Sequence, residues 1–318
     1  MVHNPASRPV CILGLGLIGG SLLRALAAAG REAYGYNRSA ATVDAASDAG
    51  FDASTDLPAT LARAAAEDAV VVLATPVPAL GAMLDAVADH SPQCLITDVV
   101  SVKEQVAELI AQRLPNARYV GGHPMAGTAE SGWAATDPEL FRDAMWMVTT
   151  EDSTSADDWL TVARLARSVG SLVVPAANDA HDRAVAAISH HPHLTAAVTA
   201  SVGAGESDLA LRLAAGSFRD GTRVAGTAPV LQRAMLEANR VALLNTLSEA
   251  IDRLTAARDA LRDSGSVEVI VDDGHRARRK YEAIAGAEPV AISGVEAGAA
   301  GWAAELRRQA HLGRVWID

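Results

Sequence analysis

The chain has 318 residues, which is enough for two domains. Its 27 basic and 38 acidic residues give a formal charge of −11, which argues against nucleic acid as a partner. Residues 1–9 are polar where a signal peptide would be apolar, and no run reaches the roughly 18 apolar residues of a membrane span, so we expect neither. Cys11 and Cys94 lie in apolar runs and are expected to be buried free thiols, as in a cytoplasmic protein.

Residues 1–177 alternate short apolar runs with segments of helical length. The apolar runs are PVCILG, EAYGY, AVVVLATP, CLITDVV, RYVGG, MWMVTT and SLVVP. Helical segments between them include residues 21–30, 77–90 and 103–114. This rhythm predicts an α/β fold with a Rossmann-type, doubly wound parallel sheet covered by helices. The near-continuous Val, Ile and Leu strands fit a sheet that is buried on both faces.

The first helix is preceded by a glycine-rich turn in VCILGLGLIGGSLLRAL, a G-x-G-x-x-G-like pattern between a strand run and a helical run. This context predicts a dinucleotide site. Gly14 permits the tight turn, Gly16 leaves room for a pyrophosphate, and Gly19 lets the helix pack closely on the strand. The N–H groups at the start of the helix, around Leu17 and Ile18, are expected to face the anion.

The end of the second strand run, GYNRSA, bears on the choice of cofactor. An NAD enzyme normally has an acidic residue there, but this chain has Asn37 followed by Arg38 and Ser39. A neutral residue beside an arginine suits a 2′-phosphate, so we favour NADP over NAD. If Arg38 only points into solvent, either cofactor could bind. Thr75 and Pro76, at the end of the AVVVLATP run, complete the expected cofactor contacts.

Four further stretches contain candidate chemistry. TDVVSVKE ends the strand run CLITDVV, at the edge where doubly wound sheets bind ligands. GGHPMAGTAESGW, residues 121–133, is poor material for a helix or a strand and predicts a shaped loop that carries His123. HDRAVAAISHHPHL and FRDGTRVAGT lie in the second half of the chain.

Together with the glycine loop, these motifs resemble, in order and spacing, the prephenate and arogenate dehydrogenases of tyrosine biosynthesis, from Val10 to Leu261. The resemblance implies oxidative decarboxylation of prephenate or arogenate with hydride transfer to NAD(P)+. His123 matches the family's catalytic histidine, which accepts the proton of the substrate's 4-hydroxyl, and neutral imidazole suits that role near neutral pH. Ser101 matches the serine that hydrogen-bonds near the same hydroxyl.

The resemblance also assigns residues to the substrate. Arg223 matches the carboxylate-binding arginine, and guanidinium suits a carboxylate because it donates two parallel bonds. His190 and His193 match two histidines of the substrate pocket.

Thr128 belongs to a loop that takes part in holding the side-chain end of the substrate. Family members carry Glu directly after this Thr, whereas here Ala129 intervenes before Glu130. This departure leaves substrate choice and feedback by tyrosine open.

Several of these residues have a structural alternative. His123 could be a loop histidine bonded to backbone. Ser101 could cap the helix that starts at Lys103, with Glu104 as capping-box partner, and Lys103 is expected to be an early helix residue rather than a catalytic group. Arg219 of FRDGTR could pair with Asp220 instead of binding substrate.

A histidine cluster raises the question of a metal site; its members are His181, His190, His191 and His193. We expect no metal, because no nearby cysteine or carboxylate pattern fits a defined site.

After Pro175 the strand runs stop, so residues 178–318 are expected to form an all-α substrate and dimerisation domain, with the boundary near residues 176–179. An apolar helical face recurs at Leu243, Leu247, Ile251, Leu254 and Leu261. Such a long apolar helix favours burial against a second subunit, so we expect a homodimer. The basic run GHRARRK, residues 274–280, is interpreted as solvated surface rather than a phosphate site.

The favoured function is therefore that of a prephenate dehydrogenase, and an arogenate dehydrogenase is the first alternative. A dehydrogenase of the 6-phosphogluconate type would need a catalytic lysine in the helical half, but no lysine lies between Lys103 and Lys280. A nucleotide-sensing protein without catalysis would have no need of His123, Ser101 and Arg223 together.

Overall fold

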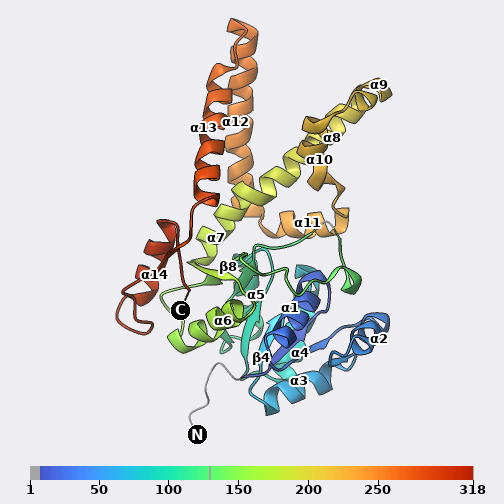
Figure 1. The fold of residues 1–318 in the computed structure, drawn as a ribbon, viewed down its shortest axis with the longest axis vertical. Coiled ribbons are helices and arrows are strands. Elements are labelled where there is room, and N and C mark those ends of the chain that lie inside the picture. The colour runs from blue at the N-terminus through green and yellow to red at the C-terminus, as the bar shows by residue number, and fades with distance from the viewer. Residues whose placement is uncertain (1–7, 129, 318) are drawn as a thin grey trace. The chain divides into compact units, whose positions relative to one another are not determined.

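The computed structural model describes residues 8–128 and 130–317 (Figure 1). The chain divides into two compact units. The first contains the residues up to Asp182, residues 226–238, and the residues from Ala291 onward. The second contains residues 183–225 and 239–290.

The first unit is built on a six-stranded parallel sheet in the order β3-β2-β1-β4-β5-β6. Its strands are β1 (Val10–Leu13), β2 (Ala33–Tyr36), β3 (Ala53–Ser54), β4 (Val70–Leu73), β5 (Leu95–Asp98) and β6 (Arg118–Tyr119). The strand order reverses direction between β1 and β4, and such a switch point is where doubly wound sheets bind nucleotides.

The four central strands end at one level. Leu13 pairs with Tyr36 on one side and with Leu73 on the other, and Leu73 pairs with Asp98. The segments that follow these strands therefore all leave the sheet at the same carboxyl edge. The glycine loop and the Ser101 segment are two of them.

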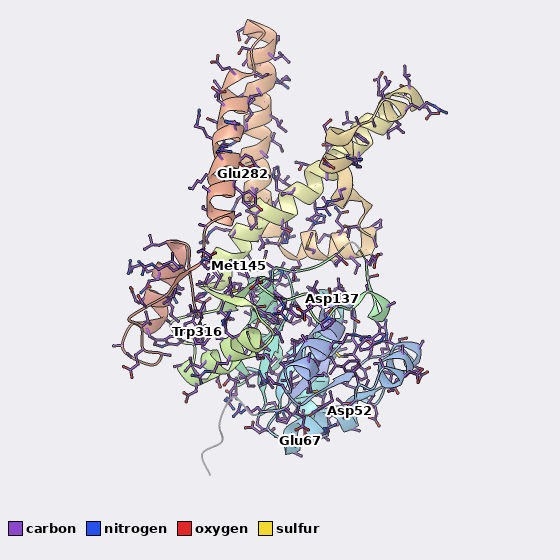
Figure 2. The ribbon with its side chains drawn as sticks, viewed as in Figure 1. Asp52, Glu67, Asp137, Met145, Glu282 and Trp316 are labelled. Carbon is purple, nitrogen blue, oxygen red and sulfur yellow. The ribbon has the colours of Figure 1, made fainter. Side chains whose placement is uncertain are left out.

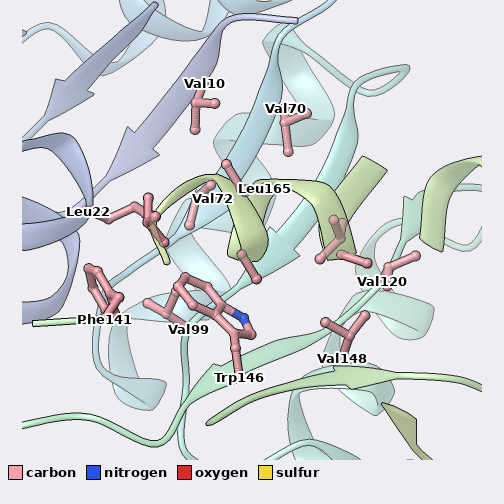
Figure 3. Packing of buried hydrophobic residues seen from close by; sticks show 14 of the residues in the cluster. Val10, Leu22, Val70, Val72, Val99, Val120, Phe141, Trp146, Val148 and Leu165 are labelled. Carbon is pink, nitrogen blue, oxygen red and sulfur yellow. The ribbon is translucent and has the colours of Figure 1, made fainter. Parts of the chain in front are cut away.

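Helices cover both faces of this sheet. They are α1 (Leu17–Ala28), α2 (Ala40–Asp48), α3 (Leu57–Ala66), α4 (Val77–His90), α5 (Glu104–Arg113) and α6 (Ala156–Ser168). Alternate residues of β1 point to opposite layers: Val10 joins the hydrophobic cluster of α1 and α6 (Figure 3), whereas Cys11 joins that of α3, α4 and α5. Both faces are buried, which explains why the strands read as continuous apolar runs.

A second, three-stranded sheet extends the first unit, and its strands are β7 (Gly122–Pro124), β8 (Met145–Thr149) and β9 (Leu172–Ala176). Strand β7 runs antiparallel to β8, and His123 is opposite Met147. The prediction of a loop from residue 121 was therefore wrong at its start. Pairing with β8 overrides the low strand propensity of Gly and Pro, because β-structure depends on its tertiary neighbours.

The C-terminal residues of the chain pack onto the first unit. They contain β10 (Val290–Ala291), α14 (Trp302–His311) and β11 (Arg314–Val315). The Trp159 ring lies 5.7 Å from that of Trp302 and 5.3 Å from that of Trp316, which is labelled in Figure 2. The division by contacts thus differs from the expected two consecutive domains, because this aromatic cluster joins the C-terminal segment to Trp159 on α6.

The second unit is helical. Helix α7 (Asn178–Val185) leads into it, followed by a π-helical turn (Ala186–His190), α8 (His191–Glu206), α9 (Asp208–Arg212) and α10 (Gly216–Thr222). Helix α11 (Pro229–Ala238) belongs to the first unit. Helices α12 (Arg240–Ser264) and α13 (Glu268–Ala285) lie side by side as a hairpin (Figure 1).

The basic run at residues 274–280 lies on α13 and is exposed. Arg276 pairs with Asp273, while Arg278 and Arg279 both pair with Glu282 (labelled in Figure 2). The prediction of a solvated surface is confirmed. Within residues 8–128 and 130–317, no helix is long and apolar enough to cross a membrane.

Candidate active site

The glycine loop between β1 and α1 forms a cradle that requires glycine at positions 14 and 19. Gly14 has a φ of +113°, and a Cβ on Gly19 would lie 1.9 Å from the carbonyl oxygen of Gly14. At Gly16, by contrast, nothing lies within 4 Å of a Cβ position, so this side of the loop is open. Because α1 begins at Leu17, its N-terminal N–H groups are available to a phosphate.

The residues after β2 and β4 add polar groups at the same edge. Asn37 Oδ1 accepts a hydrogen bond from the backbone N of Leu15, 3.1 Å away. Ser39 caps α2 by accepting from the backbone N of Thr42, and Arg38 is exposed. Thr75 Oγ1 is buried and has no hydrogen-bond partner among the described residues. Thr75 lies against the Gly14 turn, so a bound nucleotide is a natural partner for this hydroxyl.

These features fit a dinucleotide. The loop supplies backbone donors and open space for a pyrophosphate, and the unsatisfied hydroxyl lies beside it. Pro76, the N-cap residue of α4, follows directly. Residues at the expected cofactor positions therefore converge on one edge of the sheet.

A buried ion pair joins the last residue of β5 to the segment that follows it. Asp98 and Lys103 both have fully buried side chains and contact each other through Oδ1 and Nζ. Lys103 Nζ also donates to the carbonyl oxygen of Gly122, 2.6 Å away. Asp98 accepts further bonds from Tyr119 Oη at 2.7 Å and from the backbone N of Val100 at 2.8 Å. This network ties the Ser101 segment to strand β7.

Gly122 allows β7 to approach β5. A Cβ at this position would lie 2.7 Å from the carbonyl oxygen of Asp98 and 2.8 Å from Trp146 Nε1. Any side chain here would push β7 away from β5, so close packing of the two strands requires glycine at the position before His123. The strand then holds the histidine backbone on a paired, rigid element.

His123 is half-buried, and its Nδ1 lies 2.9 Å from His181 Nε2. The two rings are nearly perpendicular, at 81°. His181 Nδ1 in turn lies 2.8 Å from Asp182 Oδ1. Among the alternatives, a histidine bonded only to backbone is excluded by this side-chain partner. Asp182, His181 and His123 are therefore linked in series by side-chain contacts, and the series ends at the candidate base.

Asp182 also caps helix α5. Its Oδ1 accepts from the backbone N of Lys103 at 2.8 Å and its Oδ2 from that of Glu104 at 2.9 Å. The alternative of Ser101 as the cap was wrong: the N-cap position is Lys103, which provides no side-chain cap bond. A carboxylate from α7 satisfies these donors instead, and it also suits the positive end of the helix dipole.

Sequence reasoning missed the residues behind His123. His181 was considered only as a member of a metal cluster, and Asp182, Asp98 and the Lys103 side chain were given no role. Adjacent His and Asp in the middle of the short helix α7 are the only local signal. Their partner His123 is 58 positions away, so no local pattern could reveal the contact.

The second unit contains its own polar cluster. His190 is buried in the π-helical turn, with Nδ1 3.0 Å from Asn239 Nδ2. The pKa of His193 is lowered by burial first and by the nearby Arg223 guanidinium second, while a bond with the backbone of Val224 opposes them. His193 and Arg223 are therefore neighbours, and an anion near them would be attracted by Arg223. Short π-helical segments within α-helices are frequent at functional sites.

The remaining predicted residues are at the surface. Arg223 is exposed, and Arg219 pairs with Asp220 at 3.5 Å, which confirms that alternative. Thr128 is exposed and its Oγ1 accepts from the backbone N of Glu130 at 3.2 Å; Ala129 lies outside the described residues. Within the part of the chain that the structure describes, no three His, Cys, Asp or Glu side chains are grouped to hold a metal ion.

Comparison with known proteins decides the family. Residues 22–174 match the family model described as prephenate dehydrogenase, nucleotide-binding domain, and residues 177–271 match the one described as prephenate dehydrogenase, dimerization domain. The chain belongs to the prephenate dehydrogenase family. It is therefore an NAD(P)-dependent oxidoreductase with a Rossmann-type domain and a helical domain, and the predicted family and fold class are confirmed.

Individual relatives agree with this family. The chain is 33% identical over 265 residues to the prephenate dehydrogenase of Bacillus subtilis, covering 80% of this chain and 70% of that protein. A solved Corynebacterium glutamicum structure, assigned as a prephenate dehydrogenase, is 47% identical with a TM-score of 0.92 over 98% of both chains. The arogenate dehydrogenase of Synechocystis is 30% identical with a TM-score of 0.73, covering 86% of this chain and 99% of that one.

Proposed function

We propose that this prephenate dehydrogenase family member converts prephenate to 4-hydroxyphenylpyruvate and CO2 in tyrosine biosynthesis. The C4 carbon of the substrate loses a hydride, the C1 carboxylate leaves as CO2, and the aromatic ring that forms drives the reaction. A bound nicotinamide supplies the hydride acceptor. The observation that carries the proposal is His123, which is placed on a rigid strand at the carboxyl edge of the sheet and backed by His181 and Asp182.

Different residues of the chain act on the proton and on the carboxylate of the substrate. His123 accepts the proton of the 4-hydroxyl as the hydride leaves and returns it to the phenolate oxygen that forms when CO2 departs. Ser101, held near β7 by the Lys103 network, hydrogen-bonds the same hydroxyl. Arg223 binds a substrate carboxylate through its guanidinium, with His190 and His193 lining the same pocket. Charge and hydrogen bonds then orient the substrate, and formation of the aromatic ring of the product drives the reaction.

For the cofactor, NADP is favoured over NAD. Because Asn37 Oδ1 already accepts from Leu15 N, the amide presents its NH2 group, a donor, to a ribose substituent. Donors suit a phosphate and offer no repulsion, whereas the acidic residue of NAD enzymes accepts from a ribose hydroxyl. Arg38 adds a positive charge and Ser39 a hydroxyl at the same turn.

Arogenate is the second candidate substrate. The Synechocystis relative at 30% identity is an arogenate dehydrogenase, and the chemistry at C4 and C1 is the same for both substrates. The displaced Glu130 lies in the segment that would face the substrate side chain, where the two substrates differ. Thr128 is assigned to that end.

The assembly that fits this chain is a homodimer. Its second half matches a dimerization domain, and α12 exposes a stripe of large apolar residues. Leu244, Ile251, Leu254 and Leu261 are each more than half exposed in the single chain, whereas Leu243, which belongs to the predicted face, is buried within it. Such a stripe marks a protein interface. A cytoplasmic location is a prediction that the two buried free cysteines, Cys11 and Cys94, support.

A two-by-two initial-rate assay tests the proposal. Purified protein is given prephenate or arogenate, each with NAD+ or NADP+, and the absorbance of the reduced nicotinamide is followed. We expect turnover with prephenate, and the largest kcat/KM with NADP+. A higher kcat/KM with arogenate would assign the second candidate. Cofactor binding without turnover in all four reactions would instead indicate a nucleotide-sensing protein.

A further inference from the structure

The hydrogen-bond chain behind His123 has a defined direction that starts at Asp182. Two backbone N–H groups, of Lys103 and Glu104, donate to its oxygens. Both oxygens of Asp182 thus act as acceptors, and a carboxylate can only accept hydrogen bonds. The 2.8 Å contact with His181 Nδ1 therefore requires a proton on that nitrogen.

The direction passes through His181 to the candidate base. A neutral imidazole with hydrogen on Nδ1 has its lone pair on Nε2. His181 Nε2 is then the acceptor in the 2.9 Å contact, and His123 Nδ1 is the donor. The lone pair of His123 is consequently on Nε2, the nitrogen that can accept a proton from substrate.

We propose that His181 and Asp182 are positioning residues that fix His123 in the tautomer able to act as a base. The proposal rests on the proposed function in one respect, namely that His123 accepts a substrate proton. It goes beyond the base itself, because it explains how one of two nearly isoenergetic tautomers is selected before substrate binds. The same logic orients the histidine of Ser-His-Asp triads.

The surroundings of His181 keep it neutral, as this role requires. Burial is the main cause that lowers the pKa of His181, and the Lys103 ammonium lowers it further, whereas Asp182 and Asp98 oppose both. His123 faces His181 as well, at 2.9 Å. A protonated His181 would donate from both nitrogens and would force the hydrogen of His123 onto Nε2. Neutral His181 thus accepts a hydrogen bond that orients His123, and it does not itself take up the proton of the substrate.

The direct test is 15N NMR of histidine-labelled protein, because the nitrogen shifts distinguish the two neutral tautomers and need no substrate. The chain has nine histidines, and the His123→Asn and His181→Gln variants assign the two relevant spin systems. At neutral pH we expect both His123 and His181 to carry hydrogen on Nδ1. A wild-type spectrum with the His123 proton on Nε2 would overturn the proposal.

Two variants of His181 separate orientation from structure. His181→Gln can place an amide oxygen where Nε2 was, so it keeps an acceptor for His123. His181→Asn keeps a polar group near Asp182 but is too short to reach His123. We expect His181→Asn to lose the Nδ1 tautomer and about 10-fold or more of kcat, with KM and cofactor affinity little changed, while His181→Gln retains most of the rate.

The outcomes separate this proposal from the proposed function. Equal rates and an unchanged His123 tautomer in His181→Asn would refute the positioning role. Should His181→Asn fail to fold, the wild-type spectrum still decides. If the spectra show the expected tautomers but neither prephenate nor arogenate is turned over, the positioning role stands and the proposed function fails.

Discussion

Replacing Lys103 by Met tests how the buried ion pair holds the site. The change removes the ammonium that pairs with Asp98 and bonds the carbonyl of Gly122, all in the interior. Removing one partner of a buried pair costs about 3–5 kcal/mol, since the other charge is stranded. Tyr119 and Val100 still donate to Asp98, so we expect the lower half of this range. The catalytic rate should also fall, because Gly122 directly precedes His123.

Urea unfolding followed by tryptophan fluorescence measures this loss. All five tryptophans lie in the first unit, so the signal reports the unit that contains Lys103. The double variant Lys103→Met with Asp98→Asn should recover part of the stability, because it removes the stranded charge. Arg142→Met, which breaks an exposed ion pair with Glu139, is the matched control and should leave the midpoint unchanged. A Lys103→Met protein as stable as this control would refute the reasoning.

Four further outcomes are expected. His123→Asn should bind cofactor and substrate normally but lose about 10²- to 10⁴-fold of kcat. Weak binding with an intact maximal rate would instead make His123 a positioning residue only. Arg223→Ala should raise KM about 10-fold or more with kcat largely kept, whereas Arg219→Ala, its control, should not. Asn37→Asp preserves the acceptor for Leu15 N but adds a negative charge, so the ratio of kcat/KM for NADP+ over NAD+ should fall about 10-fold or more; an unchanged ratio would remove Asn37 from cofactor choice. Burial lowers the pKa of folded His181 below its ordinary 6.5, so the unfolded chain binds protons more tightly than the folded one. The free energy of unfolding should therefore drop as pH falls from 7 through the folded pKa, and it should drop less in His181→Gln. Equal dependence on pH in the two proteins, measured by urea unfolding, would contradict the assignment.

The sequence alone determined the parallel sheet and the glycine cradle, whereas the candidate base came from the resemblance of its motifs to a family. Continuous Val, Ile and Leu runs predict strands buried on both faces, and helices of matching length predict the crossovers. The steric demands on Gly14 and Gly19 are likewise local, since they arise within one strand–turn–helix unit. Local periodicity and turn chemistry suffice for such features.

Only the tertiary structure decided what surrounds the base. His123 lies on a strand because β8 pairs with it, and its partner His181 comes from a helix 58 positions later. The α5 cap is Asp182 rather than Ser101 for the same reason, because a carboxylate brought from elsewhere in the fold reaches the helix N-terminus. Hydrogen-bond partners that are distant in sequence leave no periodic trace, so they appear only when the chain has folded and brought them within reach.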